Sequence, residues 1–389
     1  MRHMRKLLLL IVMVGVLVAT GGCWNKVELD ERMLILGAAV DKSPSVEGKF
    51  MVTIEAANPL EAVSPMAGGE GGEEEGASWL LTGSGWTFWD AIYNSLQLSP
   101  RRLFGAHQQV LIVSEELARE GLARVIDFHY RNWELRRTVW LVIAKDSSAK
   151  DTISINHKIG GITSNEISEM INASTAASKA VQVRVVDFID RLLCDKGSAI
   201  AGRIESFEEE DEDEGVILRY TGAAVFKKDK LVGWLDEREA RGLNWIEGML
   251  ESAILVVKCP DDPKREVSVE VLFAHPEVEI QFEGDELNVT ILIDVEGNIA
   301  EIECDRGFIV EEFVEQIERR MATVVKGDIN ATLAKAQELE SDIIALGRDV
   351  HRADFRRWQE LEENWDDTFA NLDINVDVRA EIRRIGLMK

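Results

Sequence analysis

The N-terminal pattern separates cationic from apolar positions. Arg2, Arg5 and Lys6 precede an unbroken apolar run, residues 7–20, and small residues follow it. This order is typical of a secretory signal peptide. The apolar run is shorter than the about 20 residues that a membrane-spanning helix requires. The pattern therefore predicts a signal peptide over residues 1–22 and an exported mature chain.

Strand-like and helix-like segments alternate between residues 23 and 150. Aliphatic and β-branched residues predict strands at 33–40, 50–56, 79–81, 109–113 and 138–143. Apolar positions at helical spacing predict helices within 88–96 and 115–129. The Pro-, Gly- and Glu-rich stretch 58–76 buries too little apolar surface to offset its ordering entropy, so we expect a mobile loop there. The segment 23–150 is predicted to be an N-terminal α+β domain.

Residues 151–249 are predicted to form a middle domain. The sequence from Thr163 to Glu166 has the spacing of a capping box, which predicts a helix starting there. A hairpin is expected over 216–235, followed by a helix capped by Asp236. The acidic run 208–214 cannot pack, and it lacks the glycine-punctuated loop that would favour a cation site. We therefore interpret it as a solvated loop.

Residues 250–389 give the clearest pattern. Strands are expected at 267–273, 278–282, 287–295 and 299–303, with Gly297–Asn298 as a hairpin turn. A long helical stretch covers 310–343, with Gly327 at a kink or break, and an aromatic stripe at 355–369 predicts a shorter Trp-bearing helix. Strict alternation over 374–383 predicts a last strand. The fold class is therefore α+β: three mixed domains, the last an antiparallel sheet packed by the long and the Trp-bearing helices.

The small residues Gly21 and Gly22 directly before Cys23 resemble a bacterial lipobox. In such a signal the cysteine thiol receives a diacylglyceryl group, and the chain is cut directly before the cysteine. Thr20 stands where an aliphatic residue is usual, so how it affects processing is left open. An ordinary secreted protein with an incidental cysteine is the alternative. Two acyl chains would hold the protein firmly, because each buried methylene contributes about 0.8 kcal/mol.

The overall charge limits the partners. The formal net charge is −26, which argues against nucleic acid and against adsorption of the whole chain to anionic lipid. Membrane attachment is therefore expected to come from the acyl chains on Cys23. With Cys23 acylated, the three other cysteines can form at most one disulfide, and their spacing matches no zinc or redox motif. We interpret Cys194, Cys259 and Cys304 as small buried hydrophobes, with their pairing left open.

Motifs for catalysis are missing from the sequence. It contains no P-loop, His-Glu-x-x-His, Gly-x-Ser-x-Gly or dinucleotide fingerprint, so we expect no enzyme, no cofactor and no metal site. His107 is interpreted as a packed, hydrogen-bonded histidine. The remaining candidates have two interpretations each. For the cluster Arg131, Glu134, Arg136 and Arg137, an ion-pair network is favoured over a site that binds a carboxylate. For Trp79, Trp86 and Trp89, core packing is favoured over a ligand wall or a membrane-facing edge.

Several motifs together resemble a known family. They are Gly22-Cys23-Trp24, Gly222-x-Ala224-Val225-Phe226 followed by residues 230–235, Glu239-x-x-Gly242-Leu243, His351-Arg352, Trp358, Trp365 and Ile382-Arg383-Arg384. On these residues the chain resembles the Ger(x)C family, the lipoprotein C subunits of nutrient germinant receptors of spore-forming bacteria. Thr20 and the segment 353–355, where a proline is commoner, depart from the pattern, and the acidic stretches 70–75 and 208–214 resemble expanded loops.

This resemblance implies a three-domain α+β lipoprotein on the outer face of the inner spore membrane. It implies assembly with two membrane subunits, the A- and B-type subunits, of which one is permease-like. The function implied is a non-enzymatic accessory role in nutrient-triggered germination. The alternative is a lipid-anchored solute-binding protein that captures a small nutrient directly. Repeated strand–helix units of a hinged binding protein are not found after Leu250, so this alternative is less favoured.

Overall fold

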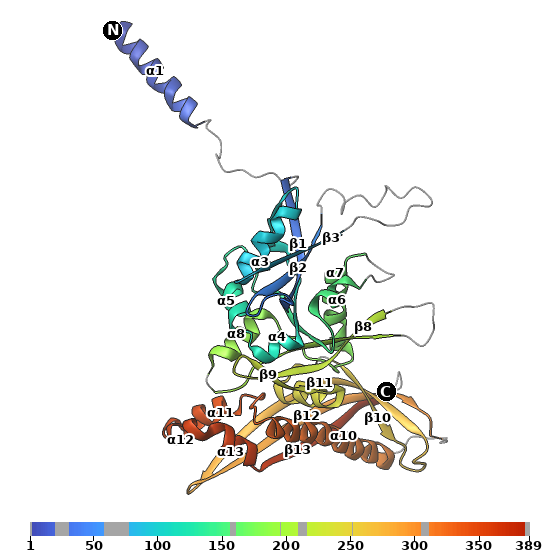
Figure 1. The fold of residues 1–389 in the computed structure, drawn as a ribbon. Helices are drawn as coiled ribbons and strands as arrows, with labels where there is room; N and C mark the ends of the chain where they lie inside the picture. Colours follow the sequence, from blue (N-terminus) through green and yellow to red (C-terminus); the bar gives the residue numbers. More distant parts are fainter. Residues whose placement is uncertain are drawn as a thin grey trace, which may run out of the picture.

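The computed structural model describes residues 2–19, 31–57, 78–155, 161–194, 196–208, 216–250, 252–304 and 311–385. Figure 1 shows helix α1 (Arg2–Ala19) apart from a body in which two sheets lie one above the other. None of the helices in these ranges is long and apolar enough to cross a bilayer. The loop predicted at 58–76 and nearly all of the acidic run, 209–214, lie outside the described residues.

The larger sheet takes its strands from the first 235 residues. Nine strands belong to it within the described ranges, and its order is β3-β2-β1-β5-β6-β7-β8-β9, with β4 paired to β1. Their bounds are β1 Arg32–Lys42, β2 Phe50–Ala57, β3 Ser78–Gly85, β4 Arg102–Phe104, β5 Val110–Ser114, β6 Trp140–Lys145, β7 Ile200–Glu208, β8 Val216–Lys227 and β9 Lys230–Leu235. Strands β1, β5, β6 and β7 are parallel, and the outer pairs are antiparallel. The predicted β8–β9 hairpin is confirmed.

This sheet bears on the predicted division at residue 150. Strand β6 lies before that position and β7 after it, and the two pair directly over residues 142–145 and 202–205. Hydrogen bonding therefore joins the segments expected to be the first and middle domains. Their separation into two domains stays a prediction.

Helices cover both faces of the larger sheet. Alternate residues of the central strands face opposite sides, so Leu111 and Val113 belong to one buried cluster and Val110 and Ile112 to the other. The first face packs against α3 (Phe88–Ser95), α4 (Glu115–Glu120), α5 (Ala123–Arg131) and α8 (Val185–Leu193). The second face packs against α6 (Ala149–Ser154) and α7 (Thr163–Ala173). This burial on both sides explains the continuous apolar runs of β5 and β6.

Two helix starts differ in how they are capped. Helix α7 begins at Thr163 as expected, but its caps come from Glu55 of β2, which accepts from the backbone N–H groups of Thr163 at 3.0 Å and Ser164 at 2.7 Å. A buried carboxylate thus replaces the local capping box that the sequence predicted. Helix α9 (Glu237–Glu247) has the predicted Asp236 cap, which accepts from the Glu239 N–H at 2.8 Å.

The second sheet contains β10 (Ala253–Lys258), β11 (Glu266–Glu283), β12 (Glu286–Ile302) and β13 (Ile374–Ile385). Pairing is antiparallel through β10, β11 and β12, but β13 lies parallel to β12. The expectation of a wholly antiparallel sheet is therefore wrong at its last strand. The helical segment between β12 and β13 is long enough to return the chain to the end of the sheet where β12 begins, which permits parallel pairing. The α+β class, with helices packed on this sheet, is confirmed.

The turn of the second sheet lies elsewhere than predicted. Strands β11 and β12 pair continuously up to Glu283 and Glu286, so the hairpin turns at Gly284 and Asp285. Gly284 has a φ of +65°, which glycine adopts without a steric penalty. Gly297–Asn298 lies inside β12, opposite the register shifts of β11, and a Cβ at Gly297 would approach Val269 and the Glu270 carbonyl. The dipeptide marks close backbone packing and a bulge rather than a turn.

The helices of the C-terminal half also correct the prediction. Helix α10 (Glu311–Glu338) runs through Gly327 without a break. Three further helices follow it, α11 (Leu346–Ala353), α12 (Phe355–Leu361) and α13 (Trp365–Asn371), and the aromatic stripe at 355–369 divides between α12 and α13, so it is not one helix. Asp354 causes one division, because its side chain accepts from the N–H groups of Arg356 at 2.9 Å and Arg357 at 3.1 Å and starts α12 afresh.

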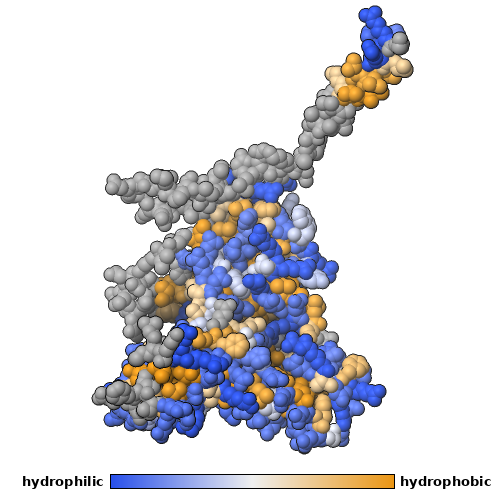
Figure 2. Space-filling view, turned by 180° about the vertical axis from the view of Figure 1, so that it is seen from behind, coloured by the Kyte–Doolittle hydropathy of each residue, from blue (hydrophilic) through white to orange (hydrophobic). Residues whose placement is uncertain are grey.

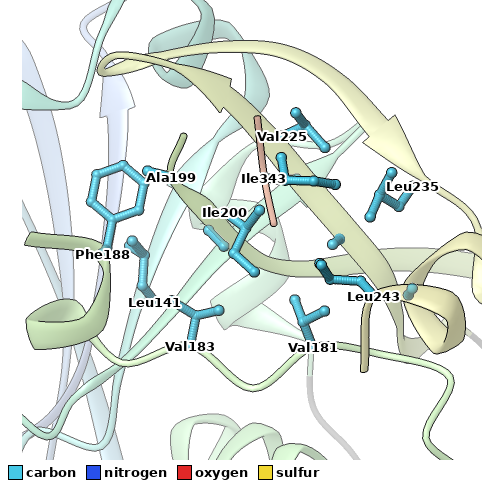
Figure 3. Packing of buried hydrophobic residues seen from close by; sticks show 14 of the residues in the cluster. Leu141, Val181, Val183, Phe188, Ala199, Ile200, Val225, Leu235, Leu243 and Ile343 are labelled. Carbon is cyan, nitrogen blue, oxygen red and sulfur yellow. The ribbon is translucent and has the colours of Figure 1, made fainter. Parts of the chain in front are cut away.

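Helices α9 and α10 join the two halves of the body. A Cβ at Gly242 of α9 would overlap Thr332 Oγ1 and the Asp328 carbonyl of α10, so glycine permits this contact. Asp328, which is buried, accepts from Arg238 at 3.1 Å and Arg241 at 2.7 Å. Figure 3 shows Leu243 of α9 and Ile343 packed beside Val225 and Leu235 of the larger sheet. We call helices α9 and α10, together with residues 341–369, the joint.

Candidate functional site

One end of the larger sheet gathers the features that could bind something. Strands β4 and β5 both pair in parallel with β1, and β6 pairs in parallel with β5, so all four strands start at this end. Strand β3 starts there too. Helices α3 and α5 return from the opposite end and finish here. We call this the tether end, because the chain enters the body here after Cys23. It consists of residues 31–34, 78–80, 93–109 and 130–139.

A cavity of about 320 Å³ lies at the tether end. Ile35, Ala38 and Ile54 of the sheet form its floor, and helices α3 and α5 form its walls. The polar groups around it are Arg32, Arg102, Gln108, Asn132 and Glu134. The Arg32 guanidinium lies over the Phe104 ring at 4.3 Å from its centre, which is a cation–π distance. The cavity therefore combines apolar walls with two guanidinium groups.

The three tryptophans expected in the core lie at the surface. Trp79, Trp86 and Trp89 are 43%, 57% and 50% exposed. Trp79 lies on β3, an edge strand, and α3 approaches that strand at Gly83 and Gly85 near its other end. Core packing was therefore the wrong interpretation of all three. Trp89 stacks on Phe128 at 5.3 Å and lines an open groove between α3 and α5 that continues the cavity.

Histidine 107 is exposed, so the prediction that it is packed is wrong. The buried histidine is His129 of α5, whose Nδ1 lies 3.1 Å from the Val125 carbonyl oxygen. Its Nε2 makes no hydrogen bond within the described part of the chain. Burial lowers the pKa of His129 to about 4, because the charged imidazolium would lose its water. The apolar positions of α5 around it were the signal that could have identified it.

The arginine cluster at the end of α5 does not form the predicted mutual network. Arg131 pairs with Asp127, one turn earlier on the same helix, at 2.7 Å. The Arg137 guanidinium lies 5.1 Å from the centre of the Tyr130 ring. These side chains are exposed and extend the cationic surface of the tether end, and Glu134 contributes to the cavity instead.

The cysteines divide into a pair and a free thiol. Cys259 and Cys304 form a disulfide that ties the chain after β10 to the chain after β12, which answers the question of pairing that the sequence left open. Cys194 is free and half-buried. Cys23, the predicted lipidation site, lies outside the described residues. In the described ranges, no cluster of three or more His, Cys, Asp or Glu side chains is arranged to hold a metal ion.

Sequence reasoning missed a buried carboxylate in the joint. Asp342 accepts from the N–H groups of Leu346 at 2.9 Å and Gly347 at 2.8 Å and from Trp365 Nε1 at 3.0 Å. Burial raises its pKa to about 6, although these donors oppose the shift. Its backbone carbonyl accepts from the Ser198 N–H at 2.8 Å, which connects the two halves. The available signal was an acid directly before the apolar run 343–346 and upstream of two tryptophans. Its role is to fix structure.

Two family models match the chain in succession. A spore germination protein N-terminal domain matches residues 25–206. A domain described as "Spore germination B3/ GerAC like, C-terminal" matches residues 221–386. The first match ends within β7 and the second begins within β8 of the larger sheet, so the second match includes most of the β8–β9 hairpin, the joint and the second sheet.

Similar proteins extend over the same length. The spore germination protein KC of Bacillus subtilis (strain 168) is 24% identical over 98% of this chain and 97% of its own. The spore germination protein B3 of the same organism is 20% identical over 96% of this chain and 97% of its own. The crystal structure of the GerBC protein matches with a TM-score of 0.55 and 17% identity over 89% of this chain and 97% of that one, which supports the fold. The chain therefore belongs to the GerC-type family of spore germination proteins.

Proposed function

We propose that this protein is a non-enzymatic lipoprotein subunit of a nutrient germinant receptor. A diacylglyceryl group on Cys23 anchors it to the outer face of the inner spore membrane, where it contacts A- and B-type membrane subunits. The observation that carries this proposal is the pair of spore germination matches covering residues 25–206 and 221–386. The names of the similar proteins describe germination and give no catalytic activity.

The lipid anchor is supported by the sequence around Cys23 and by where the body begins. Strand β1 starts at Arg32, about nine residues after Cys23. An extended chain spans at most about 3.5 Å per residue, so the tether reaches roughly 30 Å. A lipid on Cys23 thus holds the tether end close to the bilayer.

The contact role is supported by the open face of the second sheet. Helices α9, α10 and α11 pack on the other face. On the open face Ile254 and Val256 of β10 are about half exposed, and Leu272 and Phe273 of β11 are similarly exposed. Figure 2 views the body from behind and shows apolar surface among polar residues in its lower part. We propose that the membrane subunits contact this face.

Replacing the lipidated cysteine tests the anchoring claim. In spores carrying Cys23→Ala, we expect loss of the protein from the membrane fraction and a strongly reduced nutrient response. Cys194→Ser is the matched control, because it removes the free thiol but leaves the lipobox intact. A normal nutrient response from spores in which Cys23→Ala protein is present but unanchored would contradict the proposal.

Direct nutrient capture remains a second candidate because of one observation. The tether-end cavity of about 320 Å³ has apolar walls and the guanidinium groups of Arg32 and Arg102, which suit a small apolar carboxylic acid. Calorimetry of the purified protein against amino acids and sugars distinguishes the two candidates. A saturable isotherm that disappears in Arg102→Ala would favour capture, and no heat across the panel would favour the contact role.

A further inference from the structure

The tether end differs in charge from the rest of the chain. The chain contains 70 acidic and 44 basic residues. The four segments of the tether end contain only two acidic residues, Glu31 and Glu134. Its basic residues are all arginines: Arg32, Arg101, Arg102, Arg131, Arg136 and Arg137. An acidic protein therefore presents a cationic surface at the one end where the N-terminal tether joins it.

Exposed aromatic and aliphatic side chains accompany these arginines. Trp133 is 93% exposed, and Tyr93 and Leu98 are each 64% exposed. Trp79 and Leu80 add a further exposed pair at the start of β3. Tryptophan and tyrosine favour the boundary between acyl chains and headgroups, because the ring is apolar and its N–H or O–H remains hydrated. Arginine adds attraction to anionic phosphates.

Position is a third and separate observation. The chain between Cys23 and Arg32 can span at most roughly 30 Å, so the tether end lies no farther than this from the anchor. The hairpin tip at Gly284–Asp285 lies at the opposite end of the body in Figure 1. Of the two ends, only the tether end can reach the headgroups without folding the whole body back on its tether.

We propose that the tether end is a bilayer-contact surface that binds anionic phospholipid headgroups. Trp133, Tyr93 and Leu98 enter the interfacial layer, and Arg101 and Arg102 lie beside lipid phosphates. This inference rests on lipidation of Cys23 as proposed above, and it adds an orientation to that anchor. The acidic remainder of the body is repelled from an anionic surface, which favours the same upright orientation.

Spin labels on the lipidated full-length protein test this orientation. A Cys194→Ser background leaves no free thiol among the described cysteines, because Cys259 and Cys304 are paired. One label is placed at Leu98→Cys and a matched label at Glu286→Cys, beside the far hairpin tip. Both variants are reconstituted, without other proteins, in vesicles of phosphatidylcholine with phosphatidylglycerol and in vesicles of phosphatidylcholine alone.

The contact surface predicts a clear difference between the two labels. With phosphatidylglycerol present, the ratio of oxygen to nickel-complex accessibility rises several-fold at position 98 and stays at its aqueous value at position 286. Arg101→Glu with Arg102→Glu removes most of the rise, whereas the control pair Arg352→Glu and Arg356→Glu, on the exposed side of α11 and α12, leaves it unchanged.

Two failures are distinguishable. Mass spectrometry of the N-terminal peptide first establishes whether Cys23 carries lipid, and an unmodified Cys23 refutes the proposed anchor. Lipidated protein that floats with the vesicles while position 98 remains as water-accessible as position 286 refutes the contact surface alone. If the accessibility ratio at position 98 rises equally in vesicles of pure phosphatidylcholine and in the Arg101→Glu, Arg102→Glu variant, headgroup charge is refuted as the cause of the rise.

Discussion

The tether end and the joint use the same residue types in opposite ways. At the tether end Trp79 and Trp133 are 43% and 93% exposed. In the joint and its surroundings, Trp245, Trp358 and Trp365 are all at most 5% exposed. Arginines follow the same division, because those of the tether end are largely at the surface, whereas Arg238 and Arg241 converge on buried Asp328.

This difference separates binding from stability. A buried tryptophan contributes its whole area to folding, whereas an exposed one leaves that area for a partner. A surface arginine contributes little to folding, but two arginines on one buried carboxylate bind helices together. The joint is therefore expected to determine whether the protein folds, and the tether end to determine what the folded protein touches.

The largest expected effect comes from tryptophan substitutions that contrast the two regions. Trp365→Ala should reduce the free energy of unfolding by about 4 kcal/mol, because it leaves a cavity and deprives Asp342 of a hydrogen bond. Trp133→Ala should change it by less than about 0.5 kcal/mol. Urea denaturation of both variants measures the difference, and similar midpoints would contradict the division.

Breaking the buried ion pairs should have the next largest effect. Asp328→Ala leaves Arg241 half-buried without its carboxylate, so we expect a loss of about 3 kcal/mol. Glu315→Ala, which removes an exposed partner of Arg319 on the same helix, is the control and should cost less than about 0.5 kcal/mol. An Asp328→Ala variant as stable as the control would show that α9 and α10 are held together by apolar contact alone.

A methyl group between α9 and α10 should have a smaller effect. Gly242→Ala places a Cβ against Thr332 and the Asp328 carbonyl, and the helices must separate to accommodate it. Overpacking of this kind costs about 2 kcal/mol. Gly284→Ala is not a matched test because that glycine has a positive φ, so Gly327→Ala is used, where the nearest atom belongs to the movable Arg238 side chain. If thermal denaturation shows the Gly327→Ala variant to be less stable than the Gly242→Ala variant, the close approach of α9 and α10 at Gly242 is contradicted.

The smallest expected effect is on pH dependence, where buried His129 beside the tether end and buried Asp342 in the joint oppose each other. His129 has a pKa lowered from 6.5 to about 4, so its unfolded form takes up a proton first and stability is lost as the pH falls through this range. Asp342 has a pKa raised from 3.8 to about 6, so its folded form takes up a proton first and stability is gained as the pH falls from 6 toward 4.

Variants should separate these contributions. His129→Leu should lose less stability than the unmodified protein between pH 7 and pH 4.5, and Asp342→Asn should lose more. Urea denaturation at both pH values gives the comparison within each variant. Equal pH dependence of the two variants would show that neither group titrates as its burial implies.

The strands could be predicted because their alternation and β-branched content reflect burial directly. Their partners could not be predicted in the same way. Gly297–Asn298 has the composition of a tight turn, but sixteen-residue pairing of β11 with β12 places the turn at Gly284–Asp285, a dipeptide that is also typical of hairpins, so composition did not distinguish the two positions. The direction of β13 depends on how the helices between it and β12 cross the sheet, which no local pattern encodes.

Candidate site residues were harder, because residue identity does not reveal exposure. Trp79 and Trp89 have large, mostly apolar rings that favour burial, and the edge position of β3, which helps to leave Trp79 at the surface, is not visible in its sequence. Asp342 has the opposite problem, since it follows Glu338 and Glu340 and an acid in such a stretch is usually solvated. The cationic tether end was also hidden by the net charge of −26, because its arginines come from separate segments of the chain.

The long β11–β12 hairpin has a consequence for how copies of the protein can lie beside one another. Strand β10 pairs with β11 only as far as Val271, so from Phe273 to Glu283 that edge has no strand partner among the described residues. An open edge invites pairing with another copy. Pro276 removes one donor from it, and Glu277, Glu279 and Glu283 are exposed along it. Like charges on two such edges repel, so neighbouring copies can stand side by side without forming intermolecular sheets.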